Sequence, residues 1–323
     1  MHKKKILITG VAGFIGLNLS FKLINKKFNV YGIDNMSKDN NFFIKKKRKK
    51  EFIKFGGKFF KLHLCDYQKL AKFCNQEKFE FIINLAASTG VRESVKFPKK
   101  YIKNNTLGFF NLLDICKINS TKLIYASSSS VYGKKSKIPF DEKKEISFPQ
   151  NIYAFSKQSN ESMAKTYKYL HNYKTLGLRF FTVYGPWGRP DMAIYKFTKN
   201  IILGKKIEVF NKGKLSRDFT FVDDITDAIL NCLQKYNLIV KNDEILNVGG
   251  GKTYNVLNLI KMIESLINKK AKIIFKNQPG ELKKTLASNY RIKKITKTKK
   301  FTDLKTGLRL FYQWFKNTNQ IKI

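Results

Sequence analysis

The start of the chain constrains the fold most strongly, because a short apolar run there leads directly into a glycine-rich turn. Residues 5–9 are mostly apolar and β-branched, glycines follow at Gly10, Gly13 and Gly16, and residues 14–24 have a helical apolar period. This order predicts a strand, a tight turn and a helix. Glycines let the backbone approach a dinucleotide pyrophosphate closely, and the helix N-terminus attracts the negative charge of that group.

An acidic residue after the second strand favours a dinucleotide site over a glycine turn without a ligand. The strand is expected over residues 29–33 and is followed by Asp34. A carboxylate in this place can bind both hydroxyls of the adenosine ribose and would repel a 2′-phosphate. The cofactor is therefore expected to be NAD rather than NADP. The residues expected to contact this half of NAD are Gly10, Gly13, Phe14, Ile15, Gly16, Asp34 and Asn35.

Strand and helix patterns alternate five times over the first part of the chain. This alternation predicts an α/β fold with a doubly wound parallel (Rossmann) sheet and a site at the carboxyl ends of its strands. The third strand is expected over residues 58–64. Asp66 follows it, and its carboxylate is expected to meet the adenine amino group.

The fourth strand is expected over residues 81–85, and the small residues after it allow the backbone to pass close to a cofactor. Asn104 and Asn105 are expected to open a helix over residues 106–118, before a strand at residues 122–125. The further cofactor-binding residues predicted along this stretch are Asp66, Leu85, Ala86, Ala87, Asn105, Tyr153 and Lys157.

A tyrosine and a lysine four residues apart form the main catalytic motif. Tyr153 and Lys157 lie in a helix-compatible segment, so their side chains share one helical face about one turn apart. An ammonium beside the phenol stabilises the phenolate, so a tyrosine with a reference pKa of about 10 can act as a base near neutral pH. A serine from residues 127–130 could complete a proton relay. Such pairs are common by chance in a lysine-rich chain, so this motif gains its meaning from the dinucleotide motif before it.

The strongly positive charge is spread along the chain in a way that argues against nucleic-acid binding. There are 64 lysines and arginines against 23 aspartates and glutamates, a formal net charge of +41. A nucleic-acid binder would more often concentrate its basic residues in one patch with a recognisable module. Residues 40–55, which include a basic run, are therefore expected to form a solvated surface helix. No specific nucleic-acid partner is expected.

The cysteines, the histidines and the hydropathy favour a cytoplasmic protein without a metal site. The four cysteines have no paired spacing, which is typical of a reducing compartment. The three histidines form no metal motif, so no metal is expected. No apolar run approaches 18 residues, and no signal peptide is recognised, so no membrane partner is expected.

The second half of the chain predicts a smaller α/β lobe whose segments are interwoven with the first domain. The expected division is an NAD-binding domain with the tyrosine and lysine at residues 1–180 and a mainly substrate-binding lobe at residues 181–323. Helices are expected over residues 223–236 and 254–268. Strands are expected over residues 175–180, 207–210, 217–222, 245–248 and 272–275.

Seven motifs, taken in order, resemble the extended short-chain dehydrogenase/reductase superfamily. They are TGVAGFIG, LAA, YASSSSVYG, YAFSK, RFFTVYGPWGRPDMA, RDFTFVDDI and NVGGG. Among its NAD-dependent epimerases, the chain is most similar to the UDP-glucuronate 4-epimerases, over about residues 4–290. The resemblance implies that Tyr153 is the catalytic acid and base, Lys157 its lysine and Ser128 its hydroxyl partner. It also implies that Arg217 contacts the nucleotide diphosphate.

The resemblance implies reversible inversion at C4 of a UDP-sugar, in the first place UDP-glucuronate to UDP-galacturonate. The C4 hydride would move to NAD while Tyr153 takes the hydroxyl proton, and the 4-keto sugar would turn over before re-reduction. With a uronate this intermediate is a β-keto acid that can lose carbon dioxide. Ser129, Ser130 and Thr182 are expected to hold its carboxylate. Arg189 is expected to contact a carboxylate or a phosphate, or else to form an ion pair that holds its loop.

Several alternatives remain open at this point. A 4-epimerase of another UDP-hexose or of an N-acetylhexosaminuronate, or a UDP-glucuronate decarboxylase, would have the same core. A non-catalytic NAD-binding protein is a different class, but such proteins usually lose the tyrosine or the lysine. Related decarboxylases and dehydratases carry acidic residues where this chain has Ser129 and Ser130, which favours an epimerase. The C-terminal motif departs from the family pattern at Glu281 and Ser288. A homodimer is expected, because pairing through two helices per subunit is common in the superfamily.

Overall fold

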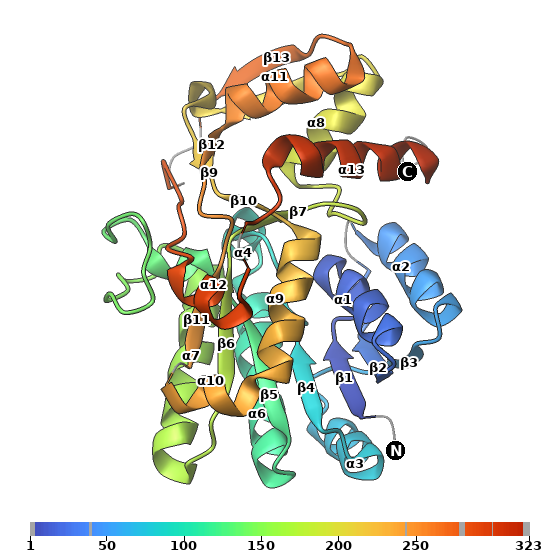
Figure 1. Ribbon diagram of the computed structural model, residues 1–323, viewed down its shortest axis with the longest axis vertical. Coiled ribbons are helices and arrows are strands. Elements are labelled where there is room, and N and C mark those ends of the chain that lie inside the picture. Colours follow the sequence, from blue (N-terminus) through green and yellow to red (C-terminus); the bar gives the residue numbers. More distant parts are fainter. Residues whose placement is uncertain (1–3, 39–40, 243, 278–281, 299, 319–323) are drawn as a thin grey trace.

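The computed structural model describes residues 4–38, 41–242, 244–277, 282–298 and 300–318. Its larger part is a sheet of seven parallel strands between two layers of helices (Figure 1). The sheet order is β11-β6-β5-β4-β1-β2-β3, which confirms the predicted doubly wound fold. The strands are β1 (Lys5–Thr9), β2 (Asn29–Asp34), β3 (Lys58–Lys61), β4 (Phe81–Asn84), β5 (Lys122–Ser128), β6 (Leu176–Phe180) and β11 (Ile245–Val248).

The central strands are buried on both faces, which explains their almost continuous apolar sequences. In β1, Ile6 and Ile8 belong to the core on one face, and Leu7 belongs to the core on the other. The first core also takes side chains from α1 (Phe14–Asn25), α2 (Phe42–Lys54), α9 (Val222–Gln234), α10 (Tyr236–Asn242) and α12 (Tyr290–Thr296). The second takes them from α3 (Tyr67–Glu77), α6 (Gly108–Ile118) and α7 (Ile152–His171).

The connection from β4 to β5 is helical over much more of its length than the sequence suggested. It contains α4 (Val91–Lys96), α5 (Pro98–Tyr101), the π-helix η1 (Ile102–Leu107) and then α6. The prediction that Asn104 and Asn105 open a helix is wrong, because both lie inside the π-helical turn. Such a turn inserts one extra residue, and π-helical turns occur often at functional sites.

A smaller lobe lies over the carboxyl ends of the main strands (Figure 1). Its core contains a regular apolar stripe of α13, formed by Leu304, Leu308, Phe311 and Phe315. Its helices are α8 (Ala193–Ile202), α11 (Val256–Ile267) and α13 (Leu304–Asn317). Its two-stranded sheets pair β13 (Lys272–Lys276) with β8 (Lys206–Phe210), β10 (Phe219–Phe221) with β7 (Thr182–Tyr184), and β12 (Tyr254–Asn255) with β9 (Ser216–Arg217).

Two of the expected elements of this lobe are different in the structure. Residues 245–248 were expected in the smaller lobe, but β11 pairs in parallel with β6 at the edge of the main sheet. The single strand expected over residues 217–222 is interrupted at Asp218, a fully buried carboxylate. Its oxygens accept hydrogen bonds from the amides of Gly250, Gly251 and Ala287 at 2.9–3.0 Å. These bonds tie the segment to two loops instead of continuing one ladder.

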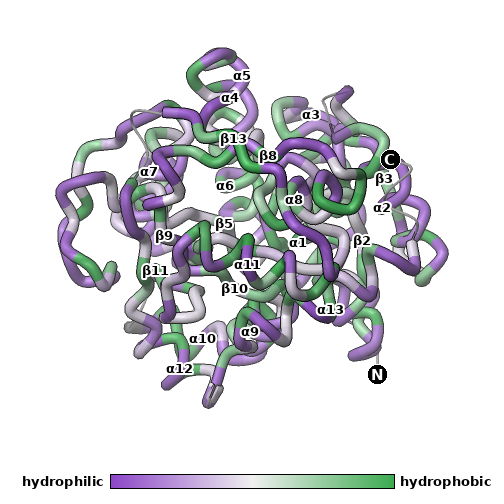
Figure 2. The backbone as a smooth tube through the Cα atoms, turned by 90° about the horizontal axis from the view of Figure 1, so that it is seen from above, coloured by the Kyte–Doolittle hydropathy of each residue, from purple (hydrophilic) through white to green (hydrophobic). Residues whose placement is uncertain are grey.

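The basic segment forms α2, a largely hydrophilic helix in Figure 2, as predicted. One of its basic residues is not solvated, however. Arg48 is only 2% exposed and points into the molecule beside Ile44 and Phe52, the two apolar residues of the same face. The expectation of a uniformly solvated basic face is therefore wrong at this position.

Candidate active site

The main cavity opens at the carboxyl ends of β1 and β4, where the order of the sheet reverses. Ligands bind at such a reversal in open α/β sheets. The Thr9 hydroxyl holds the two strand ends together, because it donates to Asn84 Oδ1 at 2.6 Å and accepts from the amide of Ala86 at 3.1 Å. Gly10 and Leu85 line the cavity directly beyond these strands.

The close packing of the glycine turn is possible only because its glycines carry no side chain. Gly10 has φ +70°, and a Cβ there would lie 2.8 Å from the Cα of Ala86. A Cβ on Gly16 would lie 2.4 Å from the Gly10 carbonyl oxygen. Gly13 is the N-cap of α1 and supplies no side-chain cap, so the first amides of the helix are open to an anion. The turn therefore fits the pyrophosphate of a dinucleotide.

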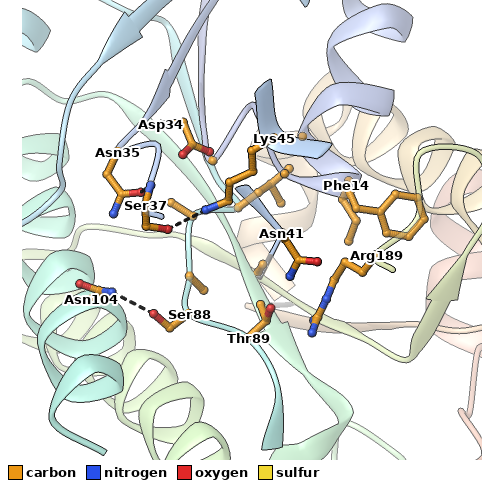
Figure 3. Close-up of a pocket in the computed structure, with 18 of the residues that line it drawn as sticks. Phe14, Asp34, Asn35, Ser37, Asn41, Lys45, Ser88, Thr89, Asn104 and Arg189 are labelled. Carbon is orange, nitrogen blue, oxygen red and sulfur yellow. Dashed lines mark hydrogen bonds between the residues drawn. The ribbon is translucent and has the colours of Figure 1, made fainter. Parts of the chain in front are cut away.

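The end of β2 provides the groups for a ribose (Figure 3). Asp34 is only 7% exposed, lines the cavity and accepts a hydrogen bond from the amide of Met36 at 2.8 Å. Lys45, from α2, extends across this corner and donates to the Ser37 hydroxyl at 2.7 Å. A carboxylate that faces the cavity at this strand end suits the two ribose hydroxyls of NAD.

Tyr153 and Lys157 reach the cavity from the first two turns of α7. The helix starts there because Asn151 caps it, accepting from the amide of Ala154 at 2.9 Å. Lys157 is 3% exposed and donates to the carbonyl of Ala126 at 2.8 Å, on the neighbouring strand β5. The phenol of Tyr153 lies close enough to the Ser128 hydroxyl, at the end of the same strand, for the serine to act on its pKa.

Burial controls the proton equilibria of this pair. Burial raises the pKa of Tyr153 above its usual value, while the Ser128 hydrogen bond and the positive charge of Arg189 act in the opposite direction. Burial also lowers the pKa of Lys157 to about 8, against the effect of the Glu161 carboxylate. The lysine is therefore an ammonium at neutral pH, the form that stabilises a phenolate.

A buried ion pair lies one turn further along α7. Glu161 accepts from Nε and Nη2 of Arg179 at 2.9 and 2.7 Å, and from the Ser127 hydroxyl at 2.5 Å. The guanidinium of Arg179 also lies 4.7 Å from the ring centre of Tyr132. These contacts attach α7 to β5 and β6, and this fixes the positions of Tyr153 and Lys157 relative to the sheet.

The π-helical turn of η1 supports the loop that follows β4. The side-chain nitrogen Nδ2 of Asn104 donates to the Ser88 hydroxyl at 2.9 Å, as Figure 3 shows. Asn105 is buried; its side chain binds both backbone groups of Ser88 and also donates to the Ser156 hydroxyl at 3.0 Å. Asn105 thus joins the loop to α7 without lining the cavity itself.

Most of the residues predicted from the sequence lie together on the cavity wall. Arg189 is among them, about one-fifth exposed and paired with Asp191 through a 3.1 Å Nε–Oδ1 hydrogen bond. The predicted residues that line the cavity are Gly10, Gly13, Phe14, Ile15, Gly16, Asp34, Asn35, Leu85, Ala86, Ala87, Ser128, Tyr153, Lys157 and Arg189.

The remaining predicted residues are not on the cavity wall. Asp66 caps α3, where its carboxylate accepts from the Lys69 amide at 3.3 Å. Arg217 donates to the carbonyl of Leu282 at 2.8 Å. The other residues in this group are Asn105, Ser129, Ser130 and Thr182, and Glu281 falls outside the described residues.

Several polar residues of the wall were not predicted from the sequence. Those from α2 and the turn before it could not be read from a motif, because the basic run suggested a solvated surface. Those beyond β4 belong to a segment interpreted only as small residues followed by a helix. The missed polar residues are Ser37, Asn41, Lys45, Arg48, His63, Ser88, Thr89, Glu93, Lys100 and Asn104.

Comparison with known proteins agrees with this arrangement. The family model "NAD dependent epimerase/dehydratase family" matches residues 6–249. Protein CapI of Staphylococcus aureus is 39% identical, over 96% of this chain and 98% of its own length. UDP-glucuronate 4-epimerase 2 of Arabidopsis thaliana is 35% identical, over 96% of this chain and 75% of its own.

A solved structure is similar over nearly the whole fold. UDP-glucuronic acid 4-epimerase from Bacillus cereus, in complex with UDP-glucuronic acid and NAD, superimposes with a TM-score of 0.90 at 31% identity. The match covers 97% of this chain and 99% of that one. The motifs, the doubly wound sheet, the glycine cradle and these matches lead to one conclusion: the chain belongs to the NAD-dependent epimerase/dehydratase family.

Proposed function

We propose that this protein is an NAD-dependent 4-epimerase that interconverts UDP-glucuronate and UDP-galacturonate. The observation that carries the proposal is the meeting of Tyr153, Lys157 and Ser128 beside a glycine cradle built for a dinucleotide. The relatives named UDP-glucuronate 4-epimerase support the choice of sugar. A role as a non-catalytic NAD-binding protein is disfavoured, because the complete acid–base pair faces the cavity.

The chain supplies binding, orientation and proton transfer. NAD, when bound, accepts the C4 hydride of the sugar and returns it. The cradle around Gly10 and the carboxylate of Asp34 would hold the pyrophosphate and the adenosine ribose. Tyr153 would remove and restore the proton of the C4 hydroxyl, with Ser128 as its hydrogen-bond partner. The ammonium of Lys157 would stabilise the phenolate form of Tyr153.

The carboxylate of a uronate needs its own partners. We propose Ser129, Ser130 and Thr182 for this role, and Arg189 as a cationic contact for the carboxylate or a phosphate. Ser130 already lies within 3.2 Å of the Ser128 hydroxyl, and Thr182 starts β7 beside the end of β6. No carboxylate occupies position 129 or 130, so the acidic partners of the related decarboxylases and dehydratases are missing there.

The deciding experiment is incubation of the purified protein with UDP-glucuronate and NMR identification of the products. UDP-galacturonate at equilibrium with the substrate is the expected result. UDP-4-keto-pentose or UDP-xylose as the main product would replace the epimerase with a decarboxylase. Turnover of UDP-glucose or an N-acetylated uronate, but not of UDP-glucuronate, would keep the 4-epimerase and change its sugar.

We further propose that the smaller lobe binds the nucleotide part of the substrate and that the protein is a cytoplasmic homodimer. The outer faces of η1, α6 and α7 expose large apolar side chains, among them Leu107 (46%), Phe110 (43%) and Phe155 (43%). Such a cluster on two adjacent helices suits pairing with a second copy. The four cysteines are free thiols, which fits a reducing compartment. Within the described residues, no helix is long and apolar enough to cross a membrane.

The dimer has its own test. Light scattering on the wild type should give twice the chain mass, and Phe110→Glu should shift the protein toward the monomer. A wild type that is monomeric at micromolar concentration would remove the dimer from the proposal without affecting the chemistry.

A further inference from the structure

A buried arginine connects the dinucleotide-binding half of the molecule to the loop that carries Arg189. Arg48 lies on α2, but its guanidinium reaches across to the loop after β7. Nη2 donates to the carbonyls of Trp187 and Gly188 at 2.6 and 3.1 Å. Nη1 lies 3.4 Å from the carbonyl of Ala12, inside the glycine turn.

The loop that Arg48 holds has a backbone that needs support. Trp187 has φ +62°, a conformation that bulky residues rarely adopt, and its ring packs 5.4 Å from that of Trp314. The carbonyl of the preceding residue, Pro186, is held separately by Asn18 at 3.1 Å. Three consecutive carbonyls of this loop are therefore fixed by side chains of α1 and α2, directly before Arg189.

The arginine is costly for the fold, which suggests that its role is more than packing. Burial lowers the pKa of Arg48 to about 9, and the nearby charge of Arg189 adds to this effect. Its Nε has no hydrogen-bond partner among the described residues. Within the part of the chain that the structure describes, its hydrogen bonds go to backbone carbonyls and none goes to a carboxylate. A lysine could not place a planar fork against two adjacent carbonyls.

We propose that Arg48 is a positioning residue that fixes the Trp187–Gly188 backbone against the glycine turn and thereby keeps Arg189 aimed into the sugar site. Arg48 lies at the cavity wall, and its effect on the sugar is exerted through Arg189. The inference rests on the proposed function of Arg189 as a contact for the carboxylate or phosphate of a UDP-sugar. Arg48 lies outside every motif recognised in the sequence.

The test is a double-mutant cycle on kcat/KM for UDP-glucuronate with Arg48→Met, Arg189→Ala and the double variant. If Arg48 acts through Arg189, Arg48→Met should raise KM about tenfold, and the double variant should match Arg189→Ala within about twofold. The ratio of decarboxylated to epimerised product, which does not depend on the active fraction, should rise in both single variants. Lys50→Met, an exposed lysine on the same helix, removes the same charge and should change neither quantity.

The outcomes distinguish the proposed role of Arg189 from the proposed role of Arg48. If Arg189→Ala leaves KM and the product ratio unchanged, the proposed role of Arg189 fails. If Arg189→Ala is impaired but the two losses multiply in the double variant, Arg48 only stabilises the fold and the inference is overturned. Should Arg48→Met be recovered unfolded, the same cycle with Arg48→Lys decides, because that variant keeps the charge and loses the fork.

Discussion

Lys157 donates a hydrogen bond to the carbonyl of Ala126 at 2.8 Å, so the lysine proposed to stabilise the phenolate is fixed to the strand that also carries Ser128. The contact joins the second turn of α7 to the end of β5, and its buried position lowers the pKa of Lys157 to about 8. The same ammonium that would stabilise a tyrosinate therefore makes folding less favourable. This relationship predicts opposite effects of one substitution on activity and on stability.

Lys157→Met should abolish epimerisation and raise the free energy of unfolding at pH 7 by about 1–3 kcal/mol, less the lost hydrogen bond. The pKa of Lys157 is lower in the folded than in the unfolded chain. Between about pH 8 and 10.5 the unfolded chain thus binds more protons, and the wild type gains stability as pH rises. Denaturant unfolding at several pH values measures this gain. The variant's advantage in free energy of unfolding over the wild type should shrink across that window. An advantage that stays constant with pH would contradict the lowered pKa of Lys157.

Tyr153→Phe should lower kcat by about 10²–10⁴-fold, because it removes the proton acceptor and little volume. Binding of the UDP-sugar, measured by calorimetry, should remain within a few-fold of the wild type. Tyr236→Phe is the matched control. Its buried phenol donates to the backbone carbonyl of Lys174 at 2.7 Å, and neither residue lines the cavity, so the variant should affect stability and leave turnover intact. Near-normal turnover by Tyr153→Phe would mean that another residue is the base.

The sequence predicted the main sheet well because its signals are local. Each signal lies within a few neighbouring residues: the apolar runs of the strands, the spacing of Gly10 and Gly16 in the turn, and the acidic residue after β2. The pair Tyr153 and Lys157 was equally visible, since one helical turn fixes their relation. These features all have a backbone cause that leaves a short pattern.

The errors concern residues whose role depends on distant partners. Arg48 stands in a run of basic residues and was expected to be solvated. Its burial depends on the loop after β7, which is distant in the sequence. Asp66 caps the next helix, a role that the sequence did not indicate, and its contact with the adenine amino group stays a prediction. The strand at residues 245–248 carries no signal for which sheet it joins, and the residues around Asn105 have no pattern that distinguishes their π-helical turn from the start of a helix.

Asp34 gives a direct test of cofactor choice. Asp34→Asn should weaken NAD binding, and denatured protein should release less NAD, because the carboxylate faces the ribose end of the cavity. The loss of repulsion should also improve the relative binding of NADP. Asp114→Asn is the control, since its carboxylate accepts from the phenols of Tyr67 and Tyr167 and does not line the cavity, so it should leave NAD content unchanged. NADP as the main nucleotide released by the wild type would refute the role of Asp34.

The last prediction concerns the fate of the uronate carboxylate. If Thr182 donates a hydrogen bond to it, Thr182→Val removes one donor at nearly constant shape. Substrate binding should weaken only modestly, by about 1.5–3 kcal/mol at most for a bond to a charged group. The larger effect should be on the keto intermediate, because a freer carboxylate reaches the alignment that releases carbon dioxide. The ratio of UDP-4-keto-pentose to UDP-galacturonate, measured by NMR, should therefore rise.

Thr166→Val is the control for this experiment, because Thr166 lies on the outside of α7, bonded to the Ser162 carbonyl at 3.0 Å. It should leave the product ratio at the wild-type value. An unchanged ratio in Thr182→Val as well would reduce Thr182 to a packing residue at the start of β7. Ser129 and Ser130 would then carry the carboxylate contacts, and Ser130→Ala should raise the ratio where Thr182→Val did not.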